Sequence, residues 1–319
     1  MVDRILQKRD RPDSATFVGS GLLEEIVHRA STDGAGRLVF DGELSPMQAR
    51  NLERTTGLAV MDRTMLILEI FGRRAITNDG KLRVELAKMQ YLGPHLIGKG
   101  IDLSRLGGGR GKRGGAGEMK LEMDRRVLRD NIVRLKRRIT EIGERRAEQR
   151  KRRRTSNVPT ISLVGYTNAG KSTLFNALTG SEVLAENLLF ATLETTTRRA
   201  HLPGGRECVF IDTVGFIKDL PENLLDAFRA TIEEIDGSHL LLHVVDASNP
   251  AFPRQIETVD RTLEELGFGE IPRIVVFNKS DLTDGEAILP MARERGGILV
   301  SALAPADVRR LAQAVEEKL

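Results

Sequence analysis

The sequence has little of what marks secreted or membrane proteins. It holds a single cysteine, Cys208, in 319 residues, which excludes an internal disulfide bond and fits a reducing cytosol. We expect this thiol to be a small buried residue of a strand. No apolar run approaches the about 20 residues that span a bilayer, and residues 1–9 contain no apolar signal core. These absences predict a cytoplasmic protein without a membrane span.

The net charge is also small, only +4, but it is unevenly distributed. Residues 1–157 contain 34 Lys and Arg against 21 Asp and Glu, which gives +13, whereas residues 158–319 contain 15 against 24, which gives −9. A basic half favours a polyanionic partner such as nucleic acid. A well-solvated helical surface remains the alternative.

A phosphate-binding loop pattern stands near the middle of the chain. Residues 165–172 fit G-x-x-x-x-G-K-[ST]. The apolar run 160–164 before it predicts a buried strand, and residues 173–178 after it predict a helix. In this order, backbone N–H groups and a helix N-terminus surround phosphate oxygens. We expect Lys171 to reach the β- and γ-phosphates and Ser172 to ligate Mg²⁺.

A D-x-x-G motif, from Asp212 to Gly215, follows the apolar run 207–211. Asp212 is expected to hold Mg²⁺ through a water molecule, and the Gly215 N–H to touch the γ-phosphate. Loss of that phosphate would release the following loop, which is the physical basis of a switch.

The sharpest signal is N-K-x-D, from Asn278 to Asp281, after the apolar run 273–277. The Asp281 carboxylate can accept both the N1–H and the 2-amino group of guanine, whereas adenine offers no such pair. A site that demands a hydrogen bond rejects the analogue lacking it by roughly 10⁴. We expect Asn278 to bond N7 and tether the loops, and Lys279 to lay its stem along the base.

The guanine O6 is expected to meet the backbone of residues 301–303, which follow the short strand 298–300. Each motif thus stands at the carboxyl end of a strand, where open α/β sheets bind ligands. The strand predicted at 240–245 and the helices near 221–235 and 252–266 complete the pattern. His243 is interpreted as structural.

The sequence therefore predicts an α/β fold with three parts. Residues 156–319 form a P-loop GTPase domain with a mostly parallel, doubly wound sheet. Residues 1–61 form a small α/β subdomain, and residues 62–155 a helical hairpin. In the small subdomain we expect strands at 4–6, 37–40 and 58–61, and helices at 22–27 and 46–52.

The hairpin prediction depends on apolar spacing. Leu82, Leu86 and Met89 recur at helical spacing, with a break at 78–80, and a second helix begins near Glu118. Its apolar residues, at 128, 132, 135, 139 and 142, step by four and three. We expect the two helices to pair in antiparallel fashion and to project about 45 Å.

A glycine-rich loop, residues 107–117, lies between these helices and carries Arg110, Lys112 and Arg113. Glycines and cations together suit close approach to phosphates. The loop has no aromatic residue, so it lacks the stacking platforms of a single-strand binder. A plain linker is the alternative.

The amino-acid sequences of these motifs resemble those of the HflX family of ribosome-associated GTPases, which are related to translation factors. The resemblance rests on residues 165–176, 189–193 and 212–217, and in the first half on residues 43–46, 62–64, 80–86 and 107–126. Because family members usually carry further N-terminal residues, we expect either that the small N-terminal sheet is incomplete here or that the start of the sequence is misassigned.

The resemblance implies a GTPase that uses Mg²⁺ and binds the large (50S) ribosomal subunit, splitting or rescuing stalled ribosomes under stress. It implies that Thr192 ligates Mg²⁺ in the GTP state, and that residues 190–194 line the nucleotide. Phe216 stands where Ras-like GTPases have a glutamine that orients water. We therefore expect slow intrinsic hydrolysis that a partner stimulates. Some members also hydrolyse ATP through the N-terminal domain, where this chain shows no second phosphate-loop motif.

Motifs and resemblance together define the expected site. The predicted nucleotide contacts are Gly165, Tyr166, Thr167, Asn168, Ala169, Gly170, Lys171, Ser172, Thr173, Phe190, Ala191, Thr192, Leu193, Glu194, Asp212, Thr213, Val214, Gly215, Asn278, Lys279, Ser280, Asp281, Ser301, Ala302 and Leu303. The predicted metal ligands are Ser172, Thr192 and, through water, Asp212. The predicted catalytic groups are Lys171, Thr192 and Gly215. The predicted RNA contacts, in the loop and on the helix after it, are Arg110, Lys112, Arg113, Lys120, Arg125 and Arg126.

Two other functions remain open at this point. One is an RNA-binding ribosome assembly or silencing factor that uses the nucleotide only as a conformational switch. The other is a signalling GTPase that acts on a protein target. In each case we expect a monomer that binds GTP and GDP.

Overall fold

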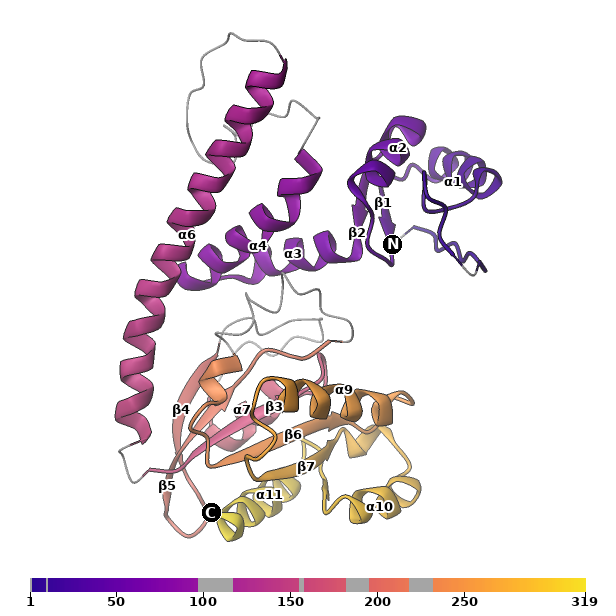
Figure 1. The fold of residues 1–319 in the computed structure, drawn as a ribbon. Coiled ribbons are helices and arrows are strands. Elements are labelled where there is room, and N and C mark those ends of the chain that lie inside the picture. Colours follow the sequence, from indigo (N-terminus) through magenta and orange to yellow (C-terminus); the bar gives the residue numbers. More distant parts are fainter. Residues whose placement is uncertain (1, 10, 97–116, 155–157, 182–194, 218–231) are drawn as a thin grey trace. The chain divides into compact units, whose positions relative to one another are not determined.

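The computed structural model of the chain describes residues 2–9, 11–96, 117–154, 158–181, 195–217 and 232–319 (Figure 1). It separates into two compact units, each described here by itself. The first comprises Met1–Gly72 and Glu85–Leu135, and the second Arg73–Val84 and Lys136–Leu319. The division into domains at 1–61, 62–155 and 156–319 stays a prediction.

The elements before the phosphate loop are mainly helical. In chain order they are α1 (Ser20–Thr32), β1 (Arg37–Phe40), α2 (Pro46–Thr56), β2 (Ala59–Asp62), α3 (Arg63–Arg74), α4 (Asn78–Leu96) and α6 (Gly117–Arg154). The strands β1 and β2 pair in parallel as a two-stranded sheet. Phe40 and Leu52 pack with Leu23 and Ile26 of α1 in the core beside this sheet.

The predicted helix at 46–52 is confirmed as part of α2, and its ends follow from local chemistry. Ser45 and Gln48 form a capping box, in which each side chain binds the other residue's backbone N–H, and Pro46 opens the first turn. Gly57, at φ 70°, closes the helix in the left-handed region, which glycine adopts without strain.

The strand predicted at residues 4–6 is wrong. Residues 2–9 have no regular secondary structure. The Arg4 N–H donates to the Asp3 side chain rather than to a neighbouring strand, and Leu6 is exposed. Ile5 still packs against the small core, so the segment covers the core without joining the sheet.

Within the first unit, α4 from residue 85 onward lies against α6 up to residue 135, as expected for the hairpin. A Cβ placed on Gly93 of α4 would lie 3.0 Å from the Leu128 side chain of α6, so the two helices are in contact there. On α6, Leu135 is buried and Ile132 half-buried, as the four-and-three spacing predicts. Four arginines of the same stretch of α6 are exposed, namely Arg125, Arg126, Arg129 and Arg134. The glycine-rich loop lies outside the described residues.

The second unit contains one six-stranded sheet in the order β4-β5-β3-β6-β7-β8. Its strands are β3 (Thr160–Gly165), β4 (Thr196–His201), β5 (Glu207–Asp212), β6 (Leu240–Asp246), β7 (Arg273–Asn278) and β8 (Ile298–Leu299). Only β4 runs antiparallel to its neighbour, so the sheet is mostly parallel as predicted. The helix predicted near 221–235 falls largely outside the described residues, except for a short 3₁₀ turn at Glu233–Ile235.

Helices cover both faces of this sheet. They are α7 (Lys171–Thr179), α9 (Phe252–Glu265), α10 (Gly285–Glu294) and α11 (Pro305–Lys318). Leu174 of α7 and Leu311 of α11 share one core cluster, whereas Ile256 of α9 and Ala292 of α10 share another. Helices α9 and α11 accordingly lie on opposite sides of the strands (Figure 1). Within the described ranges, no helix is long and apolar enough to cross a membrane.

Two residues interpreted as structural are confirmed as buried. Cys208 lies in β5, and burial raises the pKa of its thiol to about 11. His243 lies in β6 with its Nδ1 3.5 Å from Oδ1 of Asp260, which also binds Arg273 at 2.7 Å.

Candidate functional site

The phosphate loop follows β3 and leads into α7, as the motif requires. Gly165 has φ 148°, and a Cβ there would lie 2.1 Å from the Val244 carbonyl oxygen. At Gly170, with φ 89°, a Cβ would lie 2.3 Å from Nδ2 of Asn278. Both positions therefore need glycine, the first for its place against β6 and the second for its contact with the N-K-x-D motif.

Lys171 is buried at the start of α7. Its Nζ donates to the carbonyl oxygens of Gly165, at 3.2 Å, and Tyr166, at 2.9 Å. Burial lowers the pKa of Lys171 to about 8, although the charge of Asp212 acts in the opposite direction. The ammonium group is thus held inside the loop that the motif assigns to phosphate.

The D-x-x-G motif lies directly against the phosphate loop. Asp212, fully buried at the end of β5, accepts a hydrogen bond of 2.7 Å from the Ser172 hydroxyl. Phe216 exchanges two backbone bonds with the loop, donating to Gly165 O at 3.0 Å and accepting from Thr167 N at 2.8 Å. The ring of Phe216 is 2% exposed, so it is a core side chain and does not face solvent.

The N-K-x-D motif reaches back to the same loop through two side chains. Asn278, which is buried, donates from Nδ2 to the Ala169 carbonyl at 2.9 Å and accepts at Oδ1 from the Ala302 N–H at 3.0 Å. Lys279 donates from Nζ to the Asn168 carbonyl at 2.8 Å. The predicted tether between the loops is therefore present in the structure.

The loop that follows β8 is connected to Asp281. The Ser301 hydroxyl donates to Asp281 Oδ1 at 2.6 Å, and the Ser301 N–H donates to Asp307 Oδ2 at 2.9 Å. The Leu303 N–H in turn donates to the Ser301 hydroxyl at 3.3 Å. These contacts orient the carboxylate that the motif assigns to guanine.

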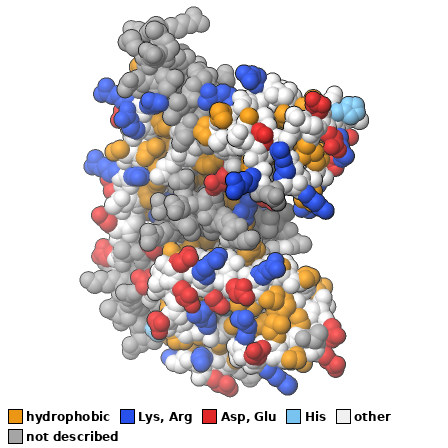
Figure 2. Space-filling model, turned by 45° about the vertical axis from the view of Figure 1, so that its right-hand side comes forward, with side chains coloured by type: hydrophobic (Ala, Val, Ile, Leu, Met, Phe, Trp, Pro, Cys, Tyr) orange, Lys and Arg blue, Asp and Glu red, His pale blue; other side chains and the backbone are white. Residues whose placement is uncertain are grey.

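The structure brings most of the predicted site together at the carboxyl ends of the parallel strands. Four of its parts meet there: residues 165–173, 212–215, 278–281 and 301–303. Residues 190–194, with Thr192, lie outside the described residues. So do Arg110, Lys112 and Arg113, and the Lys120 side chain is also not described. Arg125 and Arg126, in the first third of α6, are exposed, and Figure 2 shows Lys and Arg side chains (blue) gathered at the upper left of the view.

Two carboxylates at this site were not predicted from the sequence. Asp307 holds Ser301, as described above, and Asp246 binds Nζ of Lys279 at 2.6 Å. Asp246 ends the apolar strand β6, so the same strand-end rule that located the motifs could have found it.

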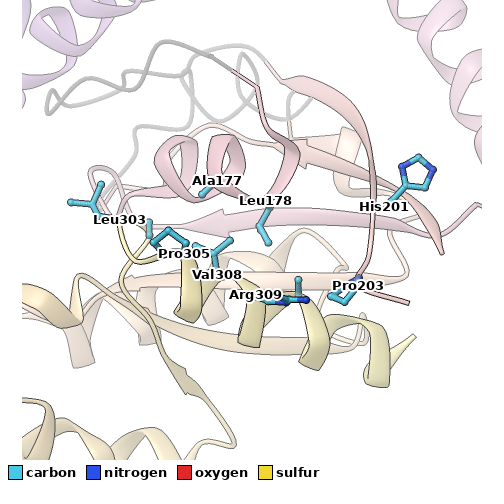
Figure 3. Close-up of a pocket in the computed structure, with 10 residues that line it drawn as sticks. Ala177, Leu178, His201, Pro203, Leu303, Pro305, Val308 and Arg309 are labelled. Atoms are coloured by element: carbon cyan, nitrogen blue, oxygen red, sulfur yellow. The ribbon is translucent and has the colours of Figure 1, made fainter. Parts of the chain in front are cut away.

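A separate cavity of about 400 Å³ lies between α7, α11 and the end of β4. Ala302 and Leu303 line it together with apolar residues such as Leu178 and Val308 (Figure 3). Of the described residues in its wall, the titratable ones, His201 and Arg309, are exposed. Among the residues of its wall that the structure describes, none is therefore a buried charged group suited to catalysis.

Comparison with known families agrees with this geometry. Three family models match consecutive parts of the chain. They are described as GTP-binding GTPase N-terminal over residues 1–72, GTP-binding GTPase Middle Region over residues 74–153, and 50S ribosome-binding GTPase over residues 160–279.

A solved structure shows a similar fold. It is a GTP-binding protein from Sulfolobus solfataricus in complex with GDP, which matches with a TM-score of 0.53 at 23% identity and covers 97% of this chain and 88% of that one. At this level of identity the likeness concerns the fold alone.

Relatives of known name are much closer in sequence. A GTPase HflX of Lacrimispora saccharolytica is 49% identical over 90% of this chain and 68% of its own length. A GTPase HflX of Escherichia coli is 45% identical over 99% of this chain and 74% of its own length. A third, from Alkalihalophilus pseudofirmus, is 44% identical over the whole chain and 75% of its own length. With this identity over almost its full length, and with a pocket assembled from the four GTPase motifs, the chain belongs to the HflX family of GTP-hydrolysing proteins.

Proposed function

We propose that this GTPase binds GTP with Mg²⁺ in the pocket formed by its motifs and hydrolyses it to GDP and phosphate on the large (50S) ribosomal subunit, to split or rescue stalled ribosomes. The observation that carries the proposal is the pair of bonds made by Asn278. One buried side chain ties the phosphate loop, at Ala169, to the loop at Ala302. A pocket joined in this way suits a ligand with both a base and phosphates.

On the base side, Asp281 accepts the guanine N1–H and 2-amino group, since Ser301 already orients its carboxylate. The stem of Lys279 lies along the base, and the backbone of residues 301–303 meets O6. An adenine base would leave Asp281 without these two donors, which costs far more than a lost apolar contact. The pocket therefore favours guanine.

On the phosphate side, the chemistry of the side chains fits Mg²⁺. The Ser172 hydroxyl and the Asp212 carboxylate lie 2.7 Å apart, and hard oxygen donors of this kind are the ligands that Mg²⁺ prefers. Bound Mg²⁺ neutralises charge on the β- and γ-phosphates. Lys171 adds a second cation at the same place, and the Gly215 N–H faces the γ-phosphate. Thr192 completes this proposal as a third oxygen ligand.

A partner is expected to complete catalysis. The glutamine that orients water in Ras-like GTPases is replaced by Phe216, whose ring is buried and cannot hydrogen-bond to water. The free protein then hydrolyses GTP slowly, and the ribosomal subunit supplies or orders the missing group.

The first half of the chain suits ribosomal RNA as that partner. It carries a net +13, and Arg125, Arg126 and their neighbours are exposed along α6. The matched family model, described as a 50S ribosome-binding GTPase, points to the large subunit.

The test is the rate of GTP hydrolysis with and without purified 50S subunits. Stimulation by subunits supports the proposal, whereas equal slow rates favour an RNA-binding factor that uses nucleotide only as a switch. Binding to 50S should also weaken by about 10³-fold between low and moderate salt if several phosphates are engaged. A salt-independent complex would contradict the RNA contact.

The loop at 107–117 gives a second arm of this test. Its deletion should weaken 50S binding and leave the dissociation constant for GDP unchanged, because the loop lies outside the nucleotide motifs. Equal loss of both would show that the loop serves the fold and not the ribosome.

A further inference from the structure

The Lys279 ammonium group is held at a fixed point beside the phosphate loop. Its Nζ lies 2.8 Å from the Asn168 carbonyl oxygen and 2.6 Å from Asp246 Oδ2. The pair is largely shielded, with side-chain exposures of 23% for Lys279 and 13% for Asp246. At this burial an ion pair is screened much less than on the open surface.

Asp246 is itself firmly placed. It pairs in register with Asn278 across β6 and β7, and the Ala247 N–H donates to the Asn278 carbonyl at 2.9 Å. Its other oxygen, Oδ1, accepts from the Ser248 N–H at 3.0 Å and from the Ser248 hydroxyl at 2.6 Å. With both oxygens bonded, the carboxylate has little freedom to turn away from the lysine.

The Lys279 backbone adds a further constraint. It has φ 63°, in the left-handed region that residues other than glycine rarely occupy. Such conformations persist where the surroundings hold them, and they cluster at ligand sites. A long, flexible side chain on this backbone would lose its place without an anchor at its far end, because lysine has many rotamers of similar energy.

We propose that Asp246 is a positioning residue for guanine nucleotides. By holding the Lys279 ammonium against the phosphate loop, it keeps the methylene stem of the lysine where the base lies. The inference rests on the proposed guanine pocket and adds to it a residue outside the four motifs. Because the contact is on the base side, GDP and GTP should depend on it equally.

The first variant is Asp246→Asn, which keeps the shape and the acceptor for Ser248 but removes the charge. The expected result is a tenfold or somewhat larger weakening of binding, about what one bond to a charged group contributes. The measurement is a titration with fluorescent GDP and with a non-hydrolysable fluorescent GTP analogue. Both dissociation constants should rise by the same factor.

The second variant shows whether Asp246 acts through Lys279. Lys279→Met keeps an unbranched apolar stem and removes the ammonium group. In this background Asp246→Asn should change GDP affinity by less than twofold, because the partner of the carboxylate is gone. A full tenfold effect in both backgrounds would overturn the proposal and assign Asp246 a general structural role.

The matched control is Asp260→Asn, which removes a carboxylate that is also in an ion pair, with Arg273, but on α9 and outside the motifs. It should lower the melting temperature and leave GDP affinity unchanged.

If Asp246→Asn does not fold, Ser248→Ala replaces it, since that change removes only the hydroxyl bond to Asp246 and should weaken GDP binding two- to threefold. Unchanged GDP affinity in whichever of these two variants folds would also overturn the proposal. Wild-type protein that binds no GDP would instead refute the guanine pocket itself.

Discussion

Replacing Asp281 with asparagine should redirect the pocket from guanine towards xanthine. In the structure the Ser301 hydroxyl donates to Asp281 Oδ1 at 2.6 Å. In Asp281→Asn the amide oxygen is the only acceptor left for that hydroxyl, so the amide nitrogen must occupy the other position. A donor would then face the two donors of guanine, whereas xanthine presents a carbonyl at the same place.

The size of the effect follows from the bonds exchanged. Each hydrogen bond to a charged group contributes about 1.5–3 kcal/mol, so the loss of two predicts roughly 3–6 kcal/mol. Because Asp281 is exposed, solvent screens part of this energy and the lower end applies. GDP affinity should therefore fall by about 10²-fold, since 1.4 kcal/mol corresponds to a factor of ten.

The assay is a pair of titrations, with fluorescent GDP and with fluorescent xanthosine diphosphate, on wild type and variant. The control is Asp284→Asn, which removes the same charge three positions later from a residue that only caps α10 through the Glu286 N–H, and should leave both affinities unchanged. If Asp281→Asn binds GDP as wild type does, the assignment of Asp281 to guanine is refuted, whatever the xanthosine result.

Three further changes test two other parts of the site and one ion pair outside it. Gly170→Ala places a Cβ 2.3 Å from Asn278 Nδ2 and should weaken GDP binding at least tenfold. The control is Gly180→Ala, where the backbone is also left-handed at φ 65° but a Cβ would meet nothing within 4 Å, so the change should cost about 1–2 kcal/mol of stability and leave GDP affinity unchanged. Equal GDP affinities of the two variants would contradict the contact. Phe216→Gln should not accelerate intrinsic hydrolysis, because the side chain is buried, and should lower the melting temperature; a faster single-turnover rate would show that the side chain reaches the water. Burial raises the pKa of Asp260, but the interaction with His243 and the charge of Arg273 more than offset it, so that the pKa lies below 3.8. The stability from this carboxylate is thus present above pH 3.8 and lost as the pH falls through the lowered pKa. Asp260→Asn should therefore reduce the free energy of unfolding at pH 7, and the difference between wild type and variant should shrink below pH 3.8. A difference in unfolding free energy that is independent of pH would exclude this linkage.

The parallel strands of the second unit were predictable because they are short apolar runs that end in motif residues. β3, β5 and β7 show this pattern, and β6 is an equally buried apolar run that ends in Asp246, outside the motifs. β4 was missed for the opposite reason. Its sequence, Thr196–His201, is polar and mostly exposed, and it is a strand only because it pairs with β5 along the edge of the sheet.

The contacts that shape the pocket were harder to predict from the sequence than the strands. The motifs predict which residues face the nucleotide, but Asp246 and Asp307 belong to none of them. Their positions depend on the register of β6 against β7 and on where α11 begins, both of which are set by packing between distant parts of the chain. The strand prediction at residues 4–6 failed for the same reason, since a short apolar segment forms a strand only where a partner strand is available.

The phosphate loop is held from two sides by different kinds of contact. On the base side, Asn278 and Lys279 reach its carbonyl oxygens with their side chains. On the phosphate side, Phe216 is joined to it by two backbone hydrogen bonds, and a Cβ on Gly215 would lie 2.7 Å from Thr167 Cα. Base-side substitutions should therefore alter GDP and GTP binding together. Because we propose that the Gly215 N–H meets the γ-phosphate, we expect discrimination between GDP and GTP to depend on the backbone at Gly215.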